Sequence, residues 1–390
     1  MQLLPSVKSW AILLLVGRFL LSTDVSHGQD DLAKVQQELS AKLQSLLAQG
    51  SAPGASAGIV FPDGKVISIV AGWADREAKK AMTPETLMIQ GSVGKTYVAA
   101  IAMQLIHAGK LNLDEKISTY LGREPWFAHL PNAQDITVKM LMNHTSGIMR
   151  YELDPKFTDD LTRQPTKVWT PAERISYVLG KKPQFAAGKG WDYSDTNYIV
   201  LGMIIEKITG KSMEELVKTR LLEPLALKQT MSSDRLTIPG LAQGYAGPKN
   251  PFGGKELMLN SDGSMIVNPQ FEWTGGGMAS TTADLARWAK LMYEGKAFDA
   301  SMLPIMLEGM SAPMLGRDVK YGLGVILRPT PLGKTYGHSG FFPGYMTEVM
   351  YWPEAKIAVA VQVNTSEFQK VKPRLTQWCV ELGGMVMRKQ

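Results

Sequence analysis

Strand patterns at both ends of the chain, separated by a helical middle, most constrain the fold. Two apolar runs at residues 57–61 and 66–70 flank Pro62-Asp63-Gly64-Lys65, which is typical of a β-hairpin. The last quarter holds three more strand patterns, at residues 321–327, 345–352 and 357–363. One antiparallel sheet built from both chain ends, flanked by helices and with a mainly helical lobe inserted, satisfies this order. The predicted class is α+β.

Helical patterns fill the rest of the chain. We predict a helix capped by Asp30 or Asp31 and ending at Gly50, and another over residues 198–208 that Gly210 closes. Thr281 or Thr282 begins a further helix, and a last one runs from about residue 370 to 385. The predicted domains are an α/β lobe of residues 29–110 and 275–390 and a helical lobe of residues 111–274. A cleft between two such lobes is a common place for a small-molecule site.

Composition excludes several classes of function. The 390 residues carry a formal charge of +6 without a basic stripe, so we expect no nucleic-acid partner. The single cysteine, Cys379, lies in an apolar helical segment and is interpreted as buried packing. The five histidines lack paired-ligand spacing, so we expect neither a metal nor another cofactor.

The first 28 residues have the pattern of an export signal. Lys8 precedes an apolar run that starts at Ala11, and residues 26–28 offer small side chains for a signal peptidase. Arg18 interrupts the run, which is too short to span a membrane. We therefore predict a signal peptide at residues 1–28, a periplasmic or secreted protein, and no stable membrane span after cleavage.

Ser92 and Lys95 form a Ser-x-x-Lys pair at the start of a predicted buried helix. Their spacing puts both side chains on one helical face, with the hydroxyl near the positive end of the helix dipole. A buried amine there loses its proton more readily than one in water, so the pair suits a nucleophile and its activator. The alternative interpretation is a helix cap followed by a surface lysine, which has the same spacing. Gly94-Lys95-Thr96 is not a phosphate-binding loop, because that motif needs glycine at position 89, which is Ile.

Two further polar clusters change the interpretation of that pair. Tyr193-Ser194-Asp195 precedes an apolar helix, and His338-Ser339-Gly340 lies on or just before a strand. With Ser92 and Lys95, these clusters resemble the three motifs of the penicillin-recognising serine hydrolases. Within this family, the chain more specifically resembles the branch of class C β-lactamases, D-alanyl-D-alanine carboxypeptidases and related esterases. The resemblance implies a β-lactamase/transpeptidase-like fold. It runs from about residue 31 to 385, with supporting phrases at residues 141–147, 222–225 and 275–280.

The resemblance also implies roles for individual residues. Ser92 would attack the substrate carbonyl and form an acyl-enzyme, Lys95 would activate it, and Tyr193 would share the proton transfers. The oxyanion would lie between the backbone N–H groups of Ser92 and Phe341, the residue after the third motif. His338, Ser339 and Gly340 would line the substrate site, with His338 holding Tyr193 and the substrate carboxylate by hydrogen bond or partial charge. His144 is interpreted as a structural residue.

One position departs from the family pattern. The second motif commonly ends in Asn, whose amide can donate to the substrate, whereas this chain has Asp195. A carboxylate cannot donate, and beside Lys95 it would favour the ammonium form. We therefore expect Asp195 to orient Lys95 and Tyr193 to carry more of the proton transfer.

The reaction predicted is acyl transfer to water, on a small-molecule or peptide substrate with an acyl bond. Carboxypeptidase-like hydrolysis of D-alanyl peptides stands first, because His338 and the export signal fit it. A β-lactamase and an esterase acting on small esters are alternatives, since they differ mainly in how fast water clears the acyl-enzyme. A non-catalytic binding protein of the same fold is a further alternative, although it would not need Ser92, Lys95 and Tyr193 together.

Overall fold

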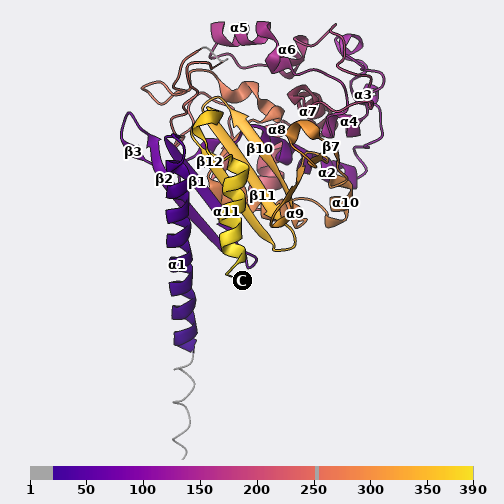
Figure 1. Ribbon diagram of the computed structural model, residues 1–390. Helices are drawn as coiled ribbons and strands as arrows, with labels where there is room; N and C mark the ends of the chain where they lie inside the picture. Colours follow the sequence, from indigo (N-terminus) through magenta and orange to yellow (C-terminus); the bar gives the residue numbers. More distant parts are fainter. Residues whose placement is uncertain (1–20, 251–253, 390) are drawn as a thin grey trace, which may run out of the picture.

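A nine-stranded antiparallel sheet forms the centre of the protein. The computed structural model describes residues 21–250 and 254–389, with side chains from Leu32 onward. The strand order is β3-β2-β1-β12-β11-β10-β9-β8-β7. The N-terminal strands β1 (Gly54–Val60) and β2 (Val66–Asp75) join the C-terminal ones because β1 pairs with β12 (Ile357–Val363), with Ala57 opposite Val361. The α+β class and the sheet built from both chain ends are confirmed (Figure 1). The other strands are β3 (Lys80–Ala81), β7 (Met310–Ser311), β8 (Lys320–Tyr321), β9 (Ile326–Thr330), β10 (Gly333–Phe342) and β11 (Tyr345–Trp352).

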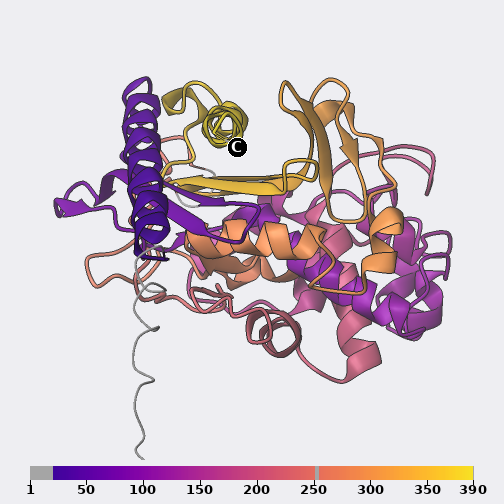
Figure 2. The same ribbon diagram turned by 90° about the horizontal axis from the view of Figure 1, so that it is seen from below.

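Two terminal helices cover one face of this sheet. Helix α1 (Leu21–Ala48) and helix α11 (Leu375–Met387) lie on the same side of the strands (Figure 2). Leu43 of α1, Trp378 of α11 and Val361 of β12 are buried together in one apolar cluster. Burying large apolar side chains contributes about 1.5–3 kcal/mol each, so this layer ties both chain ends to the sheet.

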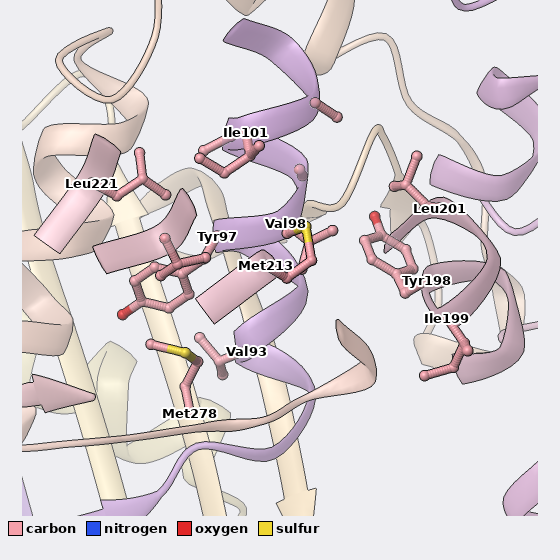
Figure 3. Close-up of a cluster of buried hydrophobic side chains, with 14 of the residues drawn as sticks. Val93, Tyr97, Val98, Ile101, Tyr198, Ile199, Leu201, Met213, Leu221 and Met278 are labelled. Atoms are coloured by element: carbon pink, nitrogen blue, oxygen red, sulfur yellow. The ribbon is translucent and has the colours of Figure 1, made fainter. Parts of the chain in front are cut away.

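The opposite face carries the larger core and the helical layer. Helix α9 (Thr282–Tyr293) lies against the sheet, with α2 (Lys95–His107) and α7 (Asp195–Thr209) in the helical layer. Tyr97 and Val98 of α2 and Tyr198 of α7 are buried in the core cluster drawn in Figure 3. Gly210, with φ of 66°, ends α7 as predicted. Shorter helices complete this layer: α3 (Ile117–Leu121), α4 (Val138–Met142), α5 (Pro155–Arg163), α6 (Pro171–Ser176), α8 (Met213–Val217) and α10 (Leu303–Met306).

Three element boundaries correct the sequence predictions. The first helix begins at Leu21 rather than at Asp30 or Asp31, because Asp in a helix interior costs only about 0.7 kcal/mol and does not force a start. The segment predicted as one strand over 321–327 is a turn between β8 and β9, since Gly324 takes a φ of 78° and Tyr321 pairs with Ile326. The last helix begins at Leu375 rather than near residue 370, because Pro373 lacks the N–H a helix needs and restricts the residue before it.

A second, three-stranded sheet was not predicted. Its order is β4 (Met88–Ile89), β6 (Met278–Ser280) and β5 (Thr230–Ser232), so the predicted helical middle also contributes a strand. Strands of two or three residues carry too little alternation to be recognised in the sequence. The sheet matters because β4 leads directly into Ser92 and β6 follows the Gly275-Gly276-Gly277 run.

The predicted signal peptide falls largely on residues 1–20, which lie outside the described residues, and the domain boundaries at 110 and 275 also stay predictions. Within the described ranges, no helix combines the length and hydropathy of a membrane span.

Candidate active site

A short 3-10 turn, η1 (Gly91–Gly94), positions Ser92 immediately before α2. Gly91 has a φ of 55°, and a Cβ atom there would lie 2.4 Å from the Phe341 carbonyl oxygen of β10. A Cβ atom on Gly94 would lie 1.7 Å from the carbonyl oxygen of Gly276. The two glycines therefore let the turn lie directly against β10 on one side and the 275–277 loop on the other. The backbone of Phe341 is thereby brought beside the turn that carries Ser92.

Lys95 is completely buried and uses all three of its N–H donors. Its Nζ donates to Ser92 Oγ at 3.0 Å, to the Asp195 carboxylate and to the Gly275 carbonyl oxygen. Burial is the largest single influence and acts to lower the pKa of Lys95, but the charge and hydrogen bond of Asp195 together with the contribution of Tyr193 outweigh it, and the pKa is raised above its ordinary value. The resting form is an ammonium without a free lone pair. The contact with Asp195 is present, and the expectation that Asp195 orients this lysine stays a prediction.

Asp195 opens α7 and lies between two cations. One carboxylate oxygen accepts from Lys95, and the other lies 3.8 Å from Arg150 Nη2. Burial acts to raise the pKa of Asp195, but the positive charges of Lys95 and Arg150 prevail and hold it well below its usual range. Asp195 is therefore a carboxylate, which binds cations and offers no proton to a substrate.

Two more carboxyl groups lie near this cluster and were missed by the sequence analysis. Glu152 accepts from Arg150 Nε at 2.6 Å, and burial together with the Asp195 charge raises the pKa of Glu152 to about 8. Glu272 is 9% exposed, and burial followed by the Asp195 charge raises its pKa well above the ordinary value. Both carboxyl groups are therefore harder to ionise than they would be in water. Arg150 and Glu152 follow shortly after the family-like phrase at residues 141–147, but this position does not reveal their contacts with the site.

The ring of Tyr193 faces the ammonium. Lys95 Nζ lies 4.8 Å from the Tyr193 ring centroid, and the His144 ring packs against Tyr193 with centroids 4.3 Å apart. The Tyr193 hydroxyl is shielded from solvent and makes no hydrogen bond within residues 21–250 and 254–389. Burial raises the pKa of Tyr193, and the nearby charge of Lys95 opposes this rise. Tyr193 is thus a neutral phenol at rest, and Lys95 would stabilise its phenolate.

His144 packs beneath this site. It is completely buried, and its Nδ1 accepts from the Ser194 backbone N–H at 3.3 Å and lies 3.1 Å from Asn197 Nδ2. Burial, reinforced by the Lys95 charge, holds the pKa of His144 well below its ordinary value. A neutral imidazole in these contacts holds the start of α7 against the Tyr193 ring.

The geometry of His338 differs from the expectation. Its Nε2 lies 2.9 Å from the Tyr321 hydroxyl, and its Nδ1 donates to the Ser339 carbonyl oxygen at 2.6 Å. Burial, then the charge of Lys95, lowers the pKa of His338 to about 3, so it is neutral. Its ring lies 6.1 Å from that of Tyr193 but makes no hydrogen bond to it among the described residues. Enclosure between Tyr321 and its own strand removes the partial charge that we expected.

The remaining third-motif residues follow the alternation of β10. Ser339 donates its hydroxyl proton to Glu348 at 2.7 Å, on the face opposite to His338. Gly340 continues the strand, and Phe341 is 40% exposed with its ring stacked on Phe368. The structure therefore brings together Ser92, Lys95, Tyr193, Asp195 and the Phe341 backbone, whereas the Ser339 side chain points elsewhere. Within the described ranges, no group of three or more His, Cys, Asp or Glu side chains is arranged to hold a metal ion.

Comparison with known proteins identifies the family. The profile described as "Beta-lactamase" matches residues 39–378. The chain belongs to the beta-lactamase family. Because the match covers most of the chain, it includes all three motifs and the nine-stranded sheet between α1 and α11.

Relatives of this beta-lactamase-family chain include several penicillin-binding proteins. It is 27% identical to penicillin-binding protein 4 of Amycolatopsis lactamdurans, covering 83% of this chain and 84% of the relative. It is also 27% identical to the teichoic acid D-alanine hydrolase of Staphylococcus aureus, over 85% of this chain and 74% of that one. Among solved structures, a D-stereospecific amidohydrolase from Streptomyces superposes with a TM-score of 0.74 at 25% identity, over 88% of this chain and 97% of that one. The chain is a serine hydrolase of the penicillin-binding type, with the β-lactamase/transpeptidase-like fold.

Proposed function

We propose that this serine hydrolase forms an acyl-enzyme on Ser92 and hydrolyses amide bonds of D-alanyl peptides, in the manner of a D-alanyl-D-alanine carboxypeptidase. The observation that carries the proposal is the 3.0 Å contact between Ser92 Oγ and the buried Lys95 ammonium, beside the Tyr193 ring. The printed names of two relatives, a teichoic acid D-alanine hydrolase and a D-stereospecific amidohydrolase, support a substrate of D configuration.

The first half-reaction is acylation. The reacting form is the one in which the Tyr193 phenol has released its proton to solvent, and the Lys95 ammonium stabilises that phenolate. Ser92 Oγ then bonds to the substrate carbonyl carbon while its proton passes to the Tyr193 phenolate. The developing oxyanion accepts hydrogen bonds from the backbone N–H groups of Ser92 and Phe341. As the C–N bond breaks, Tyr193 gives the proton to the leaving amine. The ammonium of Lys95 keeps its proton throughout, because Asp195 and the Gly275 carbonyl oxygen hold it.

The second half-reaction is hydrolysis of the acyl-enzyme. Water attacks the ester carbonyl and gives its proton to Tyr193, and the Ser92 oxygen takes that proton as it leaves. The partner is thus a small-molecule or peptide substrate with an acyl bond. We also propose export, with residues 1–28 as the signal peptide and a periplasmic or secreted mature protein. N-terminal sequencing of protein recovered outside the cytoplasm would test this, and a mature protein that still begins at Met1 would contradict it.

Intact-protein mass measurement with a fluorescent penicillin and with p-nitrophenyl esters tests the reaction, on the parent and on Ser92→Ala. A long-lived adduct on the parent, together with release of D-alanine from a D-alanyl-D-alanine peptide, supports the peptidase. A transient adduct with ring opening would indicate a β-lactamase instead, and ester turnover without any adduct an esterase. Labelling that survives Ser92→Ala would overturn the assignment of the nucleophile.

A further inference from the structure

Because position 195 is Asp rather than Asn, the site lacks the side-chain amide that would donate a hydrogen bond to the substrate. An asparagine there would accept from the lysine with its carbonyl and donate to the substrate with its N–H₂ group. Asp195 does the first, because one of its oxygens accepts from Lys95. Its other oxygen faces Arg150, so the donating function has to come from another residue.

Arg150 is held beside that oxygen by three contacts. Its Nε donates to Glu152 at 2.6 Å, its Nη2 lies 3.8 Å from Asp195, and its guanidinium carbon lies 5.6 Å from the Tyr193 ring centroid. Only one of the five N–H donors of Arg150 is used in a hydrogen bond within residues 21–250 and 254–389. The side chain is 34% exposed, so part of Arg150 is accessible from solvent.

Two other side chains of the site that could donate, Lys95 and His338, are already engaged. Lys95 has given its three protons to Ser92, Asp195 and a carbonyl oxygen. His338 is buried, with Nδ1 bonded to the Ser339 carbonyl oxygen and Nε2 to a tyrosine hydroxyl. Arg150 therefore combines a fixed position, free donors and access to solvent.

The charges around Lys95, Asp195 and Arg150 also favour binding of a substrate oxygen by Arg150. Lys95 and Arg150 are positive and Asp195 is negative, whereas burial and the Asp195 charge favour the protonated forms of Glu152 and Glu272. With both of these carboxyl groups protonated, the cluster carries one net positive charge. A substrate oxygen beside Arg150 is attracted, and a free ammonium there is repelled.

We infer that Arg150 supplies the donor that Asp195 lacks, binding a carbonyl oxygen on the acyl side of the substrate. The inference rests on the proposed acyl transfer through Ser92 and narrows its substrate class. The preferred acyl donors are N-acylated D-amino acyl compounds, whose amide carbonyl accepts from the guanidinium. D-amino acyl compounds with a free α-ammonium are disfavoured.

The test compares three p-nitrophenyl esters with the same leaving group: the acetate, the N-acetyl-D-alanine ester and the D-alanine ester. A hydrogen bond to a charged group contributes about 1.5–3 kcal/mol, which is a factor of about 10–150. In Arg150→Ala, the ratio of kcat/KM for the N-acetyl-D-alanine ester to that for the acetate should fall by about that factor. The ratio of the D-alanine ester to the acetate should rise. The matched control is Arg163→Ala, which removes an arginine ion-paired to Asp160 on α5 and should leave both ratios unchanged.

A second variant separates this role from a structural one. Asp195→Asn combined with Arg150→Ala restores an amide donor at position 195, and the N-acetyl-D-alanine ratio should recover by at least threefold over Arg150→Ala. Arg150→Lys keeps the charge next to Glu152 without the planar fork, and should lose part of the ratio even if Arg150→Ala does not fold. An unchanged ratio in the Arg150 variants, or no recovery in the double variant, would overturn the inference. Ester turnover that survives Ser92→Ala would instead overturn the proposed function, irrespective of Arg150.

Discussion

The replacement Asp195→Asn tests how the negative charge of Asp195 sets the protonation of Lys95 and Tyr193. The side chains of Lys95 and Asp195 are 0% and 14% exposed, so solvent screens their attraction only weakly. Two unit charges about 4 Å apart interact by about 4 kcal/mol at an effective dielectric constant of about 20. The Asn oxygen still accepts from Lys95, so we expect the substitution to remove about half of this interaction. That is about 2 kcal/mol, or a factor of about 30 in the ratio of ammonium to amine.

The sign of the effect follows from the removed negative charge. Asp195 raises the pKa of Lys95 and also that of Tyr193. Without its charge, both groups lose their protons more readily, and the pH dependence of kcat/KM moves to lower pH. The activity of Asp195→Asn at pH 6, as a fraction of its maximum, should therefore exceed that of the parent.

The assay is hydrolysis of p-nitrophenyl acetate from pH 5 to 10, with the ester concentration well below KM so that the rates report kcat/KM. Asp160→Asn is the control, because Asp160 is ion-paired to Lys156 and Arg163 on α5 and is not part of the candidate site. Superimposable pH profiles for Asp195→Asn and the parent would refute the electrostatic reasoning. A shift toward higher pH would refute it as well.

Three further variants probe the same region. Tyr193→Phe should lower the rate of acylation by about 10²–10⁴-fold. It should leave the urea midpoint unchanged, because the lost hydroxyl has no hydrogen-bond partner among the described residues, and a large loss of stability would contradict this. The folded state raises the pKa of Glu152 to about 8 from an ordinary 4.5, so it keeps a proton that the unfolded chain releases, and the free energy of unfolding should fall as pH rises from about 4.5 to 8. Glu152→Gln should flatten that slope in urea titrations at pH 5, 6.5 and 8, and an unaltered slope would count against it. Gly94→Ala should destabilise by about 1–3 kcal/mol or more, because its Cβ would meet a backbone oxygen, whereas Gly384→Ala within α11 should be neutral or stabilising; equal denaturation midpoints for the two would exclude the close approach.

Much of the sheet could be predicted from local patterns. The strands β11 (Tyr345–Trp352) and β12 (Ile357–Val363) match their predicted bounds because a tight turn over residues 353–356 separates two long apolar runs. The pattern around residues 321–327 failed because its glycines conceal a reversal of direction that depends on one positive φ angle. Strands of two or three residues, such as β4 and β5, are defined by their partners rather than by their own sequence.

Some residues of the candidate site could also be predicted from the sequence, whereas others could be recognised only in the folded structure. Ser92, Lys95 and Tyr193 could be proposed as neighbours because their motifs have fixed local spacing, which one sequence can display, and the structure brings the three side chains together. Arg150 could not be assigned, because its contacts with Asp195 and Tyr193 join segments that are distant in sequence and exist only after folding. The neutrality of His338 was missed because a pKa depends on burial, and no residue type reports how deeply it will be enclosed.

The pairing of β1 with β12 has a consequence for how the protein is made. Ser92 leaves the ribosome well before β10 and the strands beside it, which follow it in the chain. Contacts between such distant segments form late and slowly, because a long intervening chain must first be ordered. A nascent chain therefore carries its serine without the Phe341 backbone beside it, and an incomplete product lacks the central partner of β1. Hydrolytic activity therefore requires that β10, β11 and β12 have been made and that β12 has paired with β1.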